Sequence, residues 1–284
     1  MQKNKSIGLI ITATILWGVT FPMMKIAIVS ISPVYLTFIR FAVASIILFI
    51  LFYKRIISSS KGQILSGIYI GVFLYFGYYF QIIGIVYTSA MHSTLITGLY
   101  VVISPILAFF LLKEGLDKKV IISLFLALIG LILITGILIT NVNIGDILTL
   151  FSAIAYSFQV VYVDKYSKKY DPLALTFFQI IMVVPLSLLF LPFSGIQVAW
   201  NNTLIFSIIY LSIFATALAL LLQNFGQQGL DSATASMVFA LEPVFGVIFS
   251  YFILGETMGP LQILGGVFIV IAMILVSSRK TKNS

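Results

Sequence analysis

The sequence predicts an all-α polytopic membrane protein with ten transmembrane helices, arranged as two inverted five-helix repeats. Three observations predict this fold: the composition, the distribution of Lys and Arg along the chain, and a set of motifs that recurs after half its length. Of the 284 residues, 61% are hydrophobic and only 8% are charged, whereas about 25% of the residues of a soluble domain are charged. Such a chain has too few charged residues to form a surface that faces water, so its solvent must be a lipid bilayer.

Ten apolar stretches are long enough to cross a bilayer, which takes about 20 residues. The expected helices cover residues 7–28, 34–53, 64–86, 90–112, 119–139, 144–163, 172–192, 203–225, 232–254 and 260–277. The breaks between them carry the Pro, Gly, Asn and charged residues that are typical of loops. In chain order, these breaks include Ser32-Pro33, Lys54 to Lys61, Asp117 to Lys119, Asn141 to Asn143, Asp171-Pro172, Asn201-Asn202, Gly229 and Gly259-Pro260.

The cations predict the topology, because short loops rich in Lys and Arg stay in the cytoplasm during insertion. Threading ten helices through the membrane places fourteen of the sixteen Lys and Arg residues on one side. They are Lys3, Lys5, Lys54, Arg55, Lys61, Lys113, Lys118, Lys119, Lys165, Lys168, Lys169, Arg279, Lys280 and Lys282. Both termini are expected in the cytoplasm, which for a bacterium means an inner-membrane protein. The net charge of +8 is interpreted as topology signals and contacts with anionic lipid, not as a nucleic-acid surface.

Motifs of the first half recur in the second half at a nearly constant offset in the numbering. The matches are Ser32–Arg40 with Asp171–Gln179 at an offset of 139, Ile68-Tyr69 with Ile209-Tyr210 at 141, Ser89-Ala90 with Ser232-Ala233 at 143, and Glu114 with Glu256 at 142. Chance similarity between apolar stretches is the alternative explanation. The matches predict one five-helix repeat in residues 1–140 and a second in 141–284. An odd number of spans inverts the second repeat, as in many secondary transporters whose binding site lies at the repeat interface. Pro105 and Pro243 have the smaller offset of 138, so they are expected at different depths.

Lys25, Arg40 and Glu242 are ionisable residues inside expected spans, where a charge is costly and suggests a function. Lys25 lies on the same helix face as Trp17 and Phe21. Its ammonium group could attract the carboxylate or phosphate of a solute, or the side chain could extend to the membrane surface. Arg40 requires an anionic partner, a water-filled cavity or backbone carbonyls, so it could bind a solute anion or be structural. Glu242 lies in the middle of a span beside a proline, where it could couple transport to protons or bond a neighbouring helix.

The remaining candidates are polar side chains on the expected helices, and each could line a pathway or bond another helix. His92 could titrate near neutral pH or simply be solvated. Thr97 and Tyr100 share a stripe with Ser93 and Ser104 on the 90–112 helix. The other candidates are Tyr156 and Gln159 on the 144–163 helix, and Gln81 and Gln223, which correspond at an offset of 142.

Several of these residues resemble motifs of EamA-type carriers of the drug/metabolite transporter superfamily. In the first half they are Trp17-Gly18-x-x-Phe21-x-x-x-Lys25, Pro33 and Arg40, and in the second half Ala240–Phe245 and Leu254-Gly255-Glu256. Leu112-Lys113-Glu114 departs from the Leu-Gly-Glu of many members. The resemblance implies export, or less often uptake, of small metabolites such as amino acids. It does not transfer a particular substrate.

The expected function is therefore a secondary carrier that works by alternating access, with protons as the candidate coupling ion and a small metabolite as the solute. The alternatives are a channel, or a receptor or scaffold that does not transport. An intramembrane enzyme is disfavoured: Walker A and H-E-x-x-H motifs are absent, and Asp146, which follows Ile144-Gly145, is expected to cap a helix. The absence of Cys excludes thiolate metal sites, and no cofactor is expected. The oligomeric state is left open.

Overall fold

The computed structural model describes residues 3–113, 118–135, 143–230 and 232–277. Within these ranges the regular structure is helical, apart from an isolated antiparallel bridge between Ile31 and Val198. The elements are α1 (Lys3–Ala27), α2 (Pro33–Ile57), α3 (Lys61–Tyr87), α4 (Ala90–Thr97), α5 (Tyr100–Leu112), α6 (Lys118–Thr135), α7 (Ile144–Ser167), α8 (Pro172–Ser194), α9 (Asn202–Ile209), the π-helix η1 (Tyr210–Leu218), α10 (Ala219–Gln228), α11 (Ser232–Phe239), α12 (Leu241–Leu254) and α13 (Pro260–Ser277).

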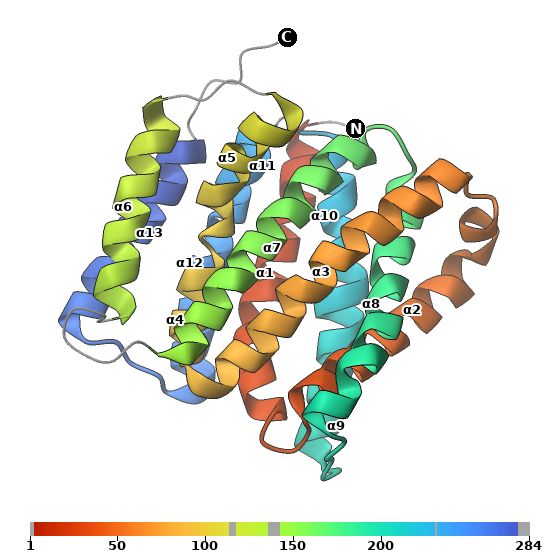
Figure 1. Cartoon of the computed structure of the whole chain (residues 1–284), viewed down its shortest axis with the longest axis horizontal. Coiled ribbons are helices and arrows are strands. Elements are labelled where there is room, and N and C mark those ends of the chain that lie inside the picture. Colours follow the sequence, from red (N-terminus) through yellow and green to blue (C-terminus); the bar gives the residue numbers. More distant parts are fainter. Residues whose placement is uncertain (1–2, 114–117, 136–142, 231, 278–284) are drawn as a thin grey trace.

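These elements form the ten predicted spans, so the fold prediction is confirmed. The pairs α4–α5 and α11–α12 and the series α9–η1–α10 each make one span, and every other helix makes one by itself (Figure 1). Within the described ranges, seven of the spans are long and apolar enough to cross a membrane, and the helices Leu241–Leu254 and Pro260–Leu275 are shorter but apolar. Large apolar side chains such as Phe110, Phe125 and Phe252 are exposed on the outside of the bundle, as expected of a surface that faces lipid.

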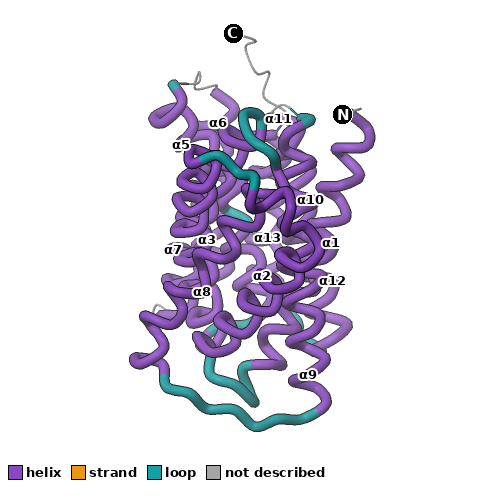
Figure 2. Tube along the Cα trace, turned by 90° about the vertical axis from the view of Figure 1, so that its right-hand side faces the viewer, coloured by secondary structure: helices purple, strands orange, loops and turns teal. Residues whose placement is uncertain are grey.

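The two halves run in opposite directions through the bundle. We call the end at which α1 begins and α13 ends the terminal end, and the opposite end, which carries residues 28–32, 88–89, 195–201 and 255–259, the distal end (Figures 1 and 2). The first helix of the first half, α1, runs from the terminal to the distal end, whereas the first helix of the second half, α7, runs back. The expected repeat boundary after residue 140, the end of the 119–139 helix, Glu114 and the cations Arg279, Lys280 and Lys282 lie outside the described residues.

The halves pack against each other along most of their length. Helix α3 lies against α7 and α8, α1 lies against α10 and α12, and α6 pairs with α13 at one side of the bundle (Figure 1). The sequence Gly67-x-x-x-Gly71 on α3 allows close helix packing. A Cβ atom on Gly71 would lie 2.7 Å from the carbonyl oxygen of Gln179 on α8.

Two spans that the sequence predicts as continuous helices are interrupted in their middle. Between α4 and α5, the amides of Leu99, Val101 and Val102 bond the third residue before them, which is 3₁₀ geometry. Between α11 and α12, Ala240 has φ −61° and ψ −13°. Gly98 and Ala240 correspond at an offset of 142 in the numbering. The interruptions therefore occupy equivalent places in the two halves, although the nearby prolines do not.

Candidate functional site

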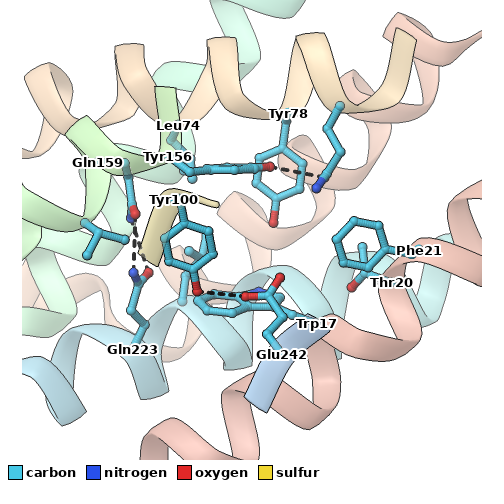
Figure 3. A pocket seen from close by; sticks show the side chains of 13 residues that line it. Trp17, Thr20, Phe21, Leu74, Tyr78, Tyr100, Tyr156, Gln159, Gln223 and Glu242 are labelled. Atoms are coloured by element: carbon cyan, nitrogen blue, oxygen red, sulfur yellow. Dashed lines mark hydrogen bonds between the residues drawn. The ribbon is translucent and has the colours of Figure 1, made fainter. Parts of the chain in front are cut away.

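The bundle contains a central, partly open cavity, and the space between its lining atoms amounts to about 430 Å³. Six spans contribute to its wall, and many of its side chains are aromatic rings or amides (Figure 3). The lining residues are Trp17, Thr20 and Phe21 of α1, Leu74, Tyr78 and Gln81 of α3, Tyr100 of α5, Tyr156, Gln159 and Val160 of α7, Leu220 and Gln223 of α10, and Glu242 of α12.

Twelve of the thirteen lining residues form pairs related by the internal repeat. Three pairs share an offset of 139, namely 17 with 156, 20 with 159 and 21 with 160; three share an offset of 142, namely 78 with 220, 81 with 223 and 100 with 242. These offsets agree with those of the repeat motifs in the sequence. The two halves therefore contribute equivalent positions to the wall, and the cavity lies where they meet.

The helix interruptions bring the only lining carboxyl group of the described residues into the cavity. Glu242 is in the first turn of α12 and only 7% exposed. Its Oε2 accepts a hydrogen bond from the hydroxyl of Tyr100, its partner in the repeat, at 2.9 Å (Figure 3). The two interruptions also touch, since a Cβ atom on Gly98 would lie 2.5 Å from Cγ of Pro243. The hydrogen bond joins the two halves at equivalent positions, and the contact joins their two interruptions.

The amides form two separate groups on the wall. Gln159 Nε2 donates to Oε1 of Gln223 at 3.2 Å and to Oε1 of Gln179 at 3.1 Å. Gln81 accepts from the Tyr156 hydroxyl at 3.2 Å and donates to Thr97 Oγ1 at 3.4 Å. Gln81 and Gln223 thus both face the cavity, but each is held by different neighbours. Thr97 lies one layer behind the wall.

Arg40 is buried beside the cavity but does not line it. Its guanidinium group donates to the hydroxyls of Thr216 and Tyr78 and to the Ala215 carbonyl, and Nη1 lies 3.8 Å from the Met24 sulfur. The guanidinium carbon also sits 4.5 Å from the centre of the Tyr78 ring. In the described part of the chain no carboxylate makes a salt bridge with Arg40. Hydroxyls, a carbonyl and an aromatic ring satisfy this cation.

Lys25 and His92 lie toward the distal end, away from the cavity wall. Lys25 Nζ donates to the carbonyls of Ile85 and Thr88 at 2.6 and 2.7 Å, at the C-terminus of α3, where a cation is favourable. The stripe of Trp17, Phe21 and Lys25 therefore lines the cavity only at its first two positions. The ring of His92 contacts Gln262 of α13 at 3.0 Å through Nε2.

Asp146 does not cap α7 as the sequence predicted. The side chain of Asn143 accepts from the Gly145 amide and caps the helix. Asp146 is buried in the first turn and accepts from the Thr88 hydroxyl at 2.6 Å, with His92 Nδ1 3.7 Å away. The cap prediction was wrong because Asn143 already occupies the position that precedes the first turn.

The distal end is tied together by contacts between separate spans. The Ser32 amide donates to the Gln197 carbonyl at 2.9 Å, and the Ala199 amide donates to the Ser30 carbonyl at 2.7 Å. The Glu256 carboxylate accepts from the first two amides of α4, at 2.9 and 2.8 Å, where the helix dipole favours an anion. These bonds join the two halves of the chain at the distal end.

A second, partly open cavity, with about 370 Å³ of space between its lining atoms, is formed by residues nearer the terminal end. It is lined by Ser104, Pro105, Ala108, Leu112, Val160, Val161, Asp164, Gln227, Ala235, Ser236 and Phe239. Val160 belongs to both walls. The Phe239 ring stacks on Trp17 and meets the edge of Tyr100. Val160 therefore lies between the two cavities, and Phe239 lies in the second cavity against two rings of the first.

The sequence-based candidates divide into two groups in the structure. Eight of them line the central cavity: Trp17, Phe21, Gln81, Tyr100, Tyr156, Gln159, Gln223 and Glu242. Lys25, Arg40, His92 and Thr97 do not. The sequence analysis missed Thr20, Leu74, Tyr78, Val160 and Leu220. Applying the repeat offset to Gln159 and Phe21 would have indicated Thr20 and Val160, whereas no signal in the sequence marks Leu74.

Inverted halves around a shared cavity define the class of multi-pass membrane transporters. The chain belongs to the EamA-like transporter family, which matches residues 4–136 and 143–278. An uncharacterized transporter of Archaeoglobus fulgidus is 35% identical over 96% of this chain and 85% of its own length. The uncharacterized transporter YyaM of Bacillus subtilis is 26% identical over 93% of this chain and 90% of its own length. A protein crystal structure that is 15% identical shares the fold over 98% of both chains, with a TM-score of 0.72. The protein is thus a transporter rather than an enzyme.

Proposed function

We propose that the protein is a secondary carrier that exports small polar metabolites, such as amino acids, across the cytoplasmic membrane by alternating access. The observation that carries the proposal is the pairing of lining residues across the repeat. When two inverted halves contribute equivalent positions to one site, exchange of their conformations opens that site to opposite sides of the membrane.

The two ends of the bundle support the same mechanism. Bonds from Ser32, Ala199 and Glu256 close the distal end, whereas a second cavity lies toward the terminal end behind Val160 and Phe239. In the proposal, solute enters through this second cavity, and the distal bonds break when the carrier opens outward. Lys25 and His92 act as distal closing residues, and Arg40 and Thr97 support the wall through Tyr78 and Gln81.

Glu242 is the proposed coupling residue. It is buried, it lines the cavity, and one carboxyl oxygen is held by Tyr100. A carboxyl group at this place can carry a proton in one conformation and release it in the other. The terminal end is proposed to face the cytoplasm because it carries the Lys and Arg residues of the loops.

Flux into proteoliposomes tests the carrier proposal. We expect saturable uptake and counterflow, in which unlabelled solute on one side drives labelled solute across from the other. Conductance that does not saturate would instead indicate a channel. The solutes to test come from untargeted metabolite profiling of medium from cells with and without the gene.

A further inference from the structure

We propose that the central cavity selects its solutes by an ammonium group, so that the substrates are small organic amines with an apolar, preferably aromatic, body. This inference rests on the proposed carrier function and names its substrate class. Within the proposed metabolites, it predicts that an amine binds better than the corresponding amino acid, and that a carboxylic acid binds worst.

The charges on the cavity wall give the first reason for this proposal. Of the lining residues in the described part of the chain, only Glu242 has a carboxylic acid, and Lys, Arg and His do not contribute to the wall. A solute carboxylate would therefore lose its hydration without meeting a cation. A solute ammonium group would meet a carboxylate.

The hydrogen-bond donors of the wall give the second step, because most of them already bond within the protein. Trp17 Nε1 donates to the Ala215 carbonyl at 3.1 Å, and the Thr20 hydroxyl donates to the Leu16 carbonyl at 3.2 Å. The hydroxyls of Tyr100 and Tyr156 donate to Glu242 and Gln81. The side-chain amide groups of Gln81, Gln159 and Gln223 each donate to a neighbouring side chain.

The hydrogen-bond acceptors of the wall are less completely occupied by donors of the protein. Glu242 Oε2 accepts from Tyr100, but no described side chain bonds Oε1, and Figure 3 shows this oxygen facing the open part of the cavity. The rings of Trp17, Phe21 and Tyr156 lie on the same wall. Aromatic faces attract cations, most strongly where water is excluded. The wall thus offers a carboxylate oxygen and ring faces to a group that donates hydrogen bonds and carries positive charge.

The buried cation next to the cavity does not alter this result. Arg40 uses its N–H groups on Thr216, Tyr78 and the Ala215 carbonyl, and the Tyr78 ring lies over its guanidinium carbon. Tyr78 lines the cavity, whereas Arg40 does not. A solute anion could accept from the Tyr78 hydroxyl, whose oxygen accepts from Arg40, but direct contact with the guanidinium group would require the displacement of Tyr78.

Tryptophan fluorescence tests the proposal without requiring transport. The chain contains two Trp residues: Trp17 in the cavity wall, and Trp200, which is exposed near the distal end. In a Trp200→Phe background, Trp17 reports on occupancy of the cavity. The purified protein is titrated with phenylethylamine, phenylethanol, phenylalanine and phenylpropionate, which share a ring but differ in charge.

We expect phenylethylamine to change Trp17 emission saturably and to bind at least about tenfold more tightly than phenylethanol or phenylpropionate. Glu242→Gln should remove this preference, and Glu242→Asp, which keeps the charge, should retain it. Asp171→Asn is the matched control, because Asp171 lies outside the cavity, where it pairs with Arg55, and it should leave the preference unchanged.

Equal or tighter binding of phenylpropionate would overturn the substrate class, and so would the absence of any response to the four compounds. Neither result decides the carrier proposal, which is judged by counterflow of the metabolites found by profiling. Conversely, amine-selective binding without flux of any solute would support the recognition site and reject the carrier.

Discussion

The two halves of the chain place equivalent backbone positions around the cavity but carry different side chains at these positions. At one pair of positions the first half has Trp17 where the second has Tyr156, and both are aromatic. At another, the first half has Tyr100 where the second has Glu242, and only one of these is a carboxylic acid. In the proposed mechanism the backbone symmetry provides two interchangeable conformations, and the difference in side chains is the proposed source of the preference for amines.

Arg40 and Gln179 extend this comparison behind the wall. They correspond at an offset of 139 in the numbering, and both are buried. Arg40 is anchored to Thr216 and Tyr78, while Gln179 belongs to the amide group of Gln159. The first half therefore buries a cation, and the second half a neutral amide, at the same place in the fold.

The largest expected effect comes from removing the carboxylic acid of the Tyr100/Glu242 pair. Glu242→Gln should reduce proton-driven transport by at least about tenfold, because a side chain that cannot release a proton cannot couple. The residual transport should lose its dependence on pH between about 5.5 and about 8. Proteoliposome flux across this range measures both effects. An unchanged pH profile would rule out the coupling role.

Replacement of Arg40 by glutamine, the residue at the equivalent position 179, tests the comparison of the two buried residues behind the cavity wall. Arg40→Gln deprives Thr216, Tyr78 and the Ala215 carbonyl of their charged donor, and bonds of this kind contribute about 1.5–3 kcal/mol each. We expect a lower unfolding temperature and yield in detergent, with the order of solute affinities retained in the protein that folds. Normal stability combined with selective loss of an anionic solute would instead place Arg40 in the recognition site.

The equivalent helix interruptions differ in a residue that can be tested directly. The first has Gly98 and the second has Ala240, and Gly98 is pressed against Pro243. Gly98→Ala should destabilise the protein by about 1–3 kcal/mol, the usual cost of overpacking. Gly8→Ala is the control, since nothing lies within 4 Å of a Cβ atom there. Equal thermal stability of the two variants would contradict the close contact between the interruptions.

The smallest effect is expected from the paired amides. Gln223→Leu leaves Gln159 with Gln179 as its remaining side-chain partner, so we expect a loss of about 1 kcal/mol in stability. Gln81→Leu removes a partner of Tyr156 and Thr97 and should cost a similar amount. Thermal unfolding of the two variants compares the halves, and a several-fold larger loss for one would show that the amide groups are not equivalent.

The sequence was sufficient to predict the ten spans and their inverted arrangement. Apolar length and the positions of the cations depend only on local composition, which the chain displays directly. The interruptions at Gly98 and Ala240 were not predicted, because hydropathy does not distinguish a 3₁₀ turn from an α-helix. The prolines do not mark the interruptions consistently, since Pro105 lies beyond the first interruption and Pro243 just after the second.

The candidate site could be predicted only in part. A helix that is apolar on all sides gives no periodic signal of which face is turned inward, so Arg40 and Lys25 were indistinguishable from Glu242 as buried ions. Tertiary contacts separate them. Arg40 is covered by Tyr78 and Lys25 is held by the end of α3, whereas Glu242 is turned into the cavity by the interruption before α12.

The central claim is that solute crosses between the two halves and that the distal end must open for it to leave. Ile31 and Val198 form an antiparallel bridge there, a pairing with a spacing that suits a disulfide, and the chain contains no Cys of its own. In the double variant Ile31→Cys/Val198→Cys, oxidation should stop counterflow and reduction should restore it, while the two single variants remain active under both conditions. Undiminished counterflow in the fully oxidised double variant would contradict the account.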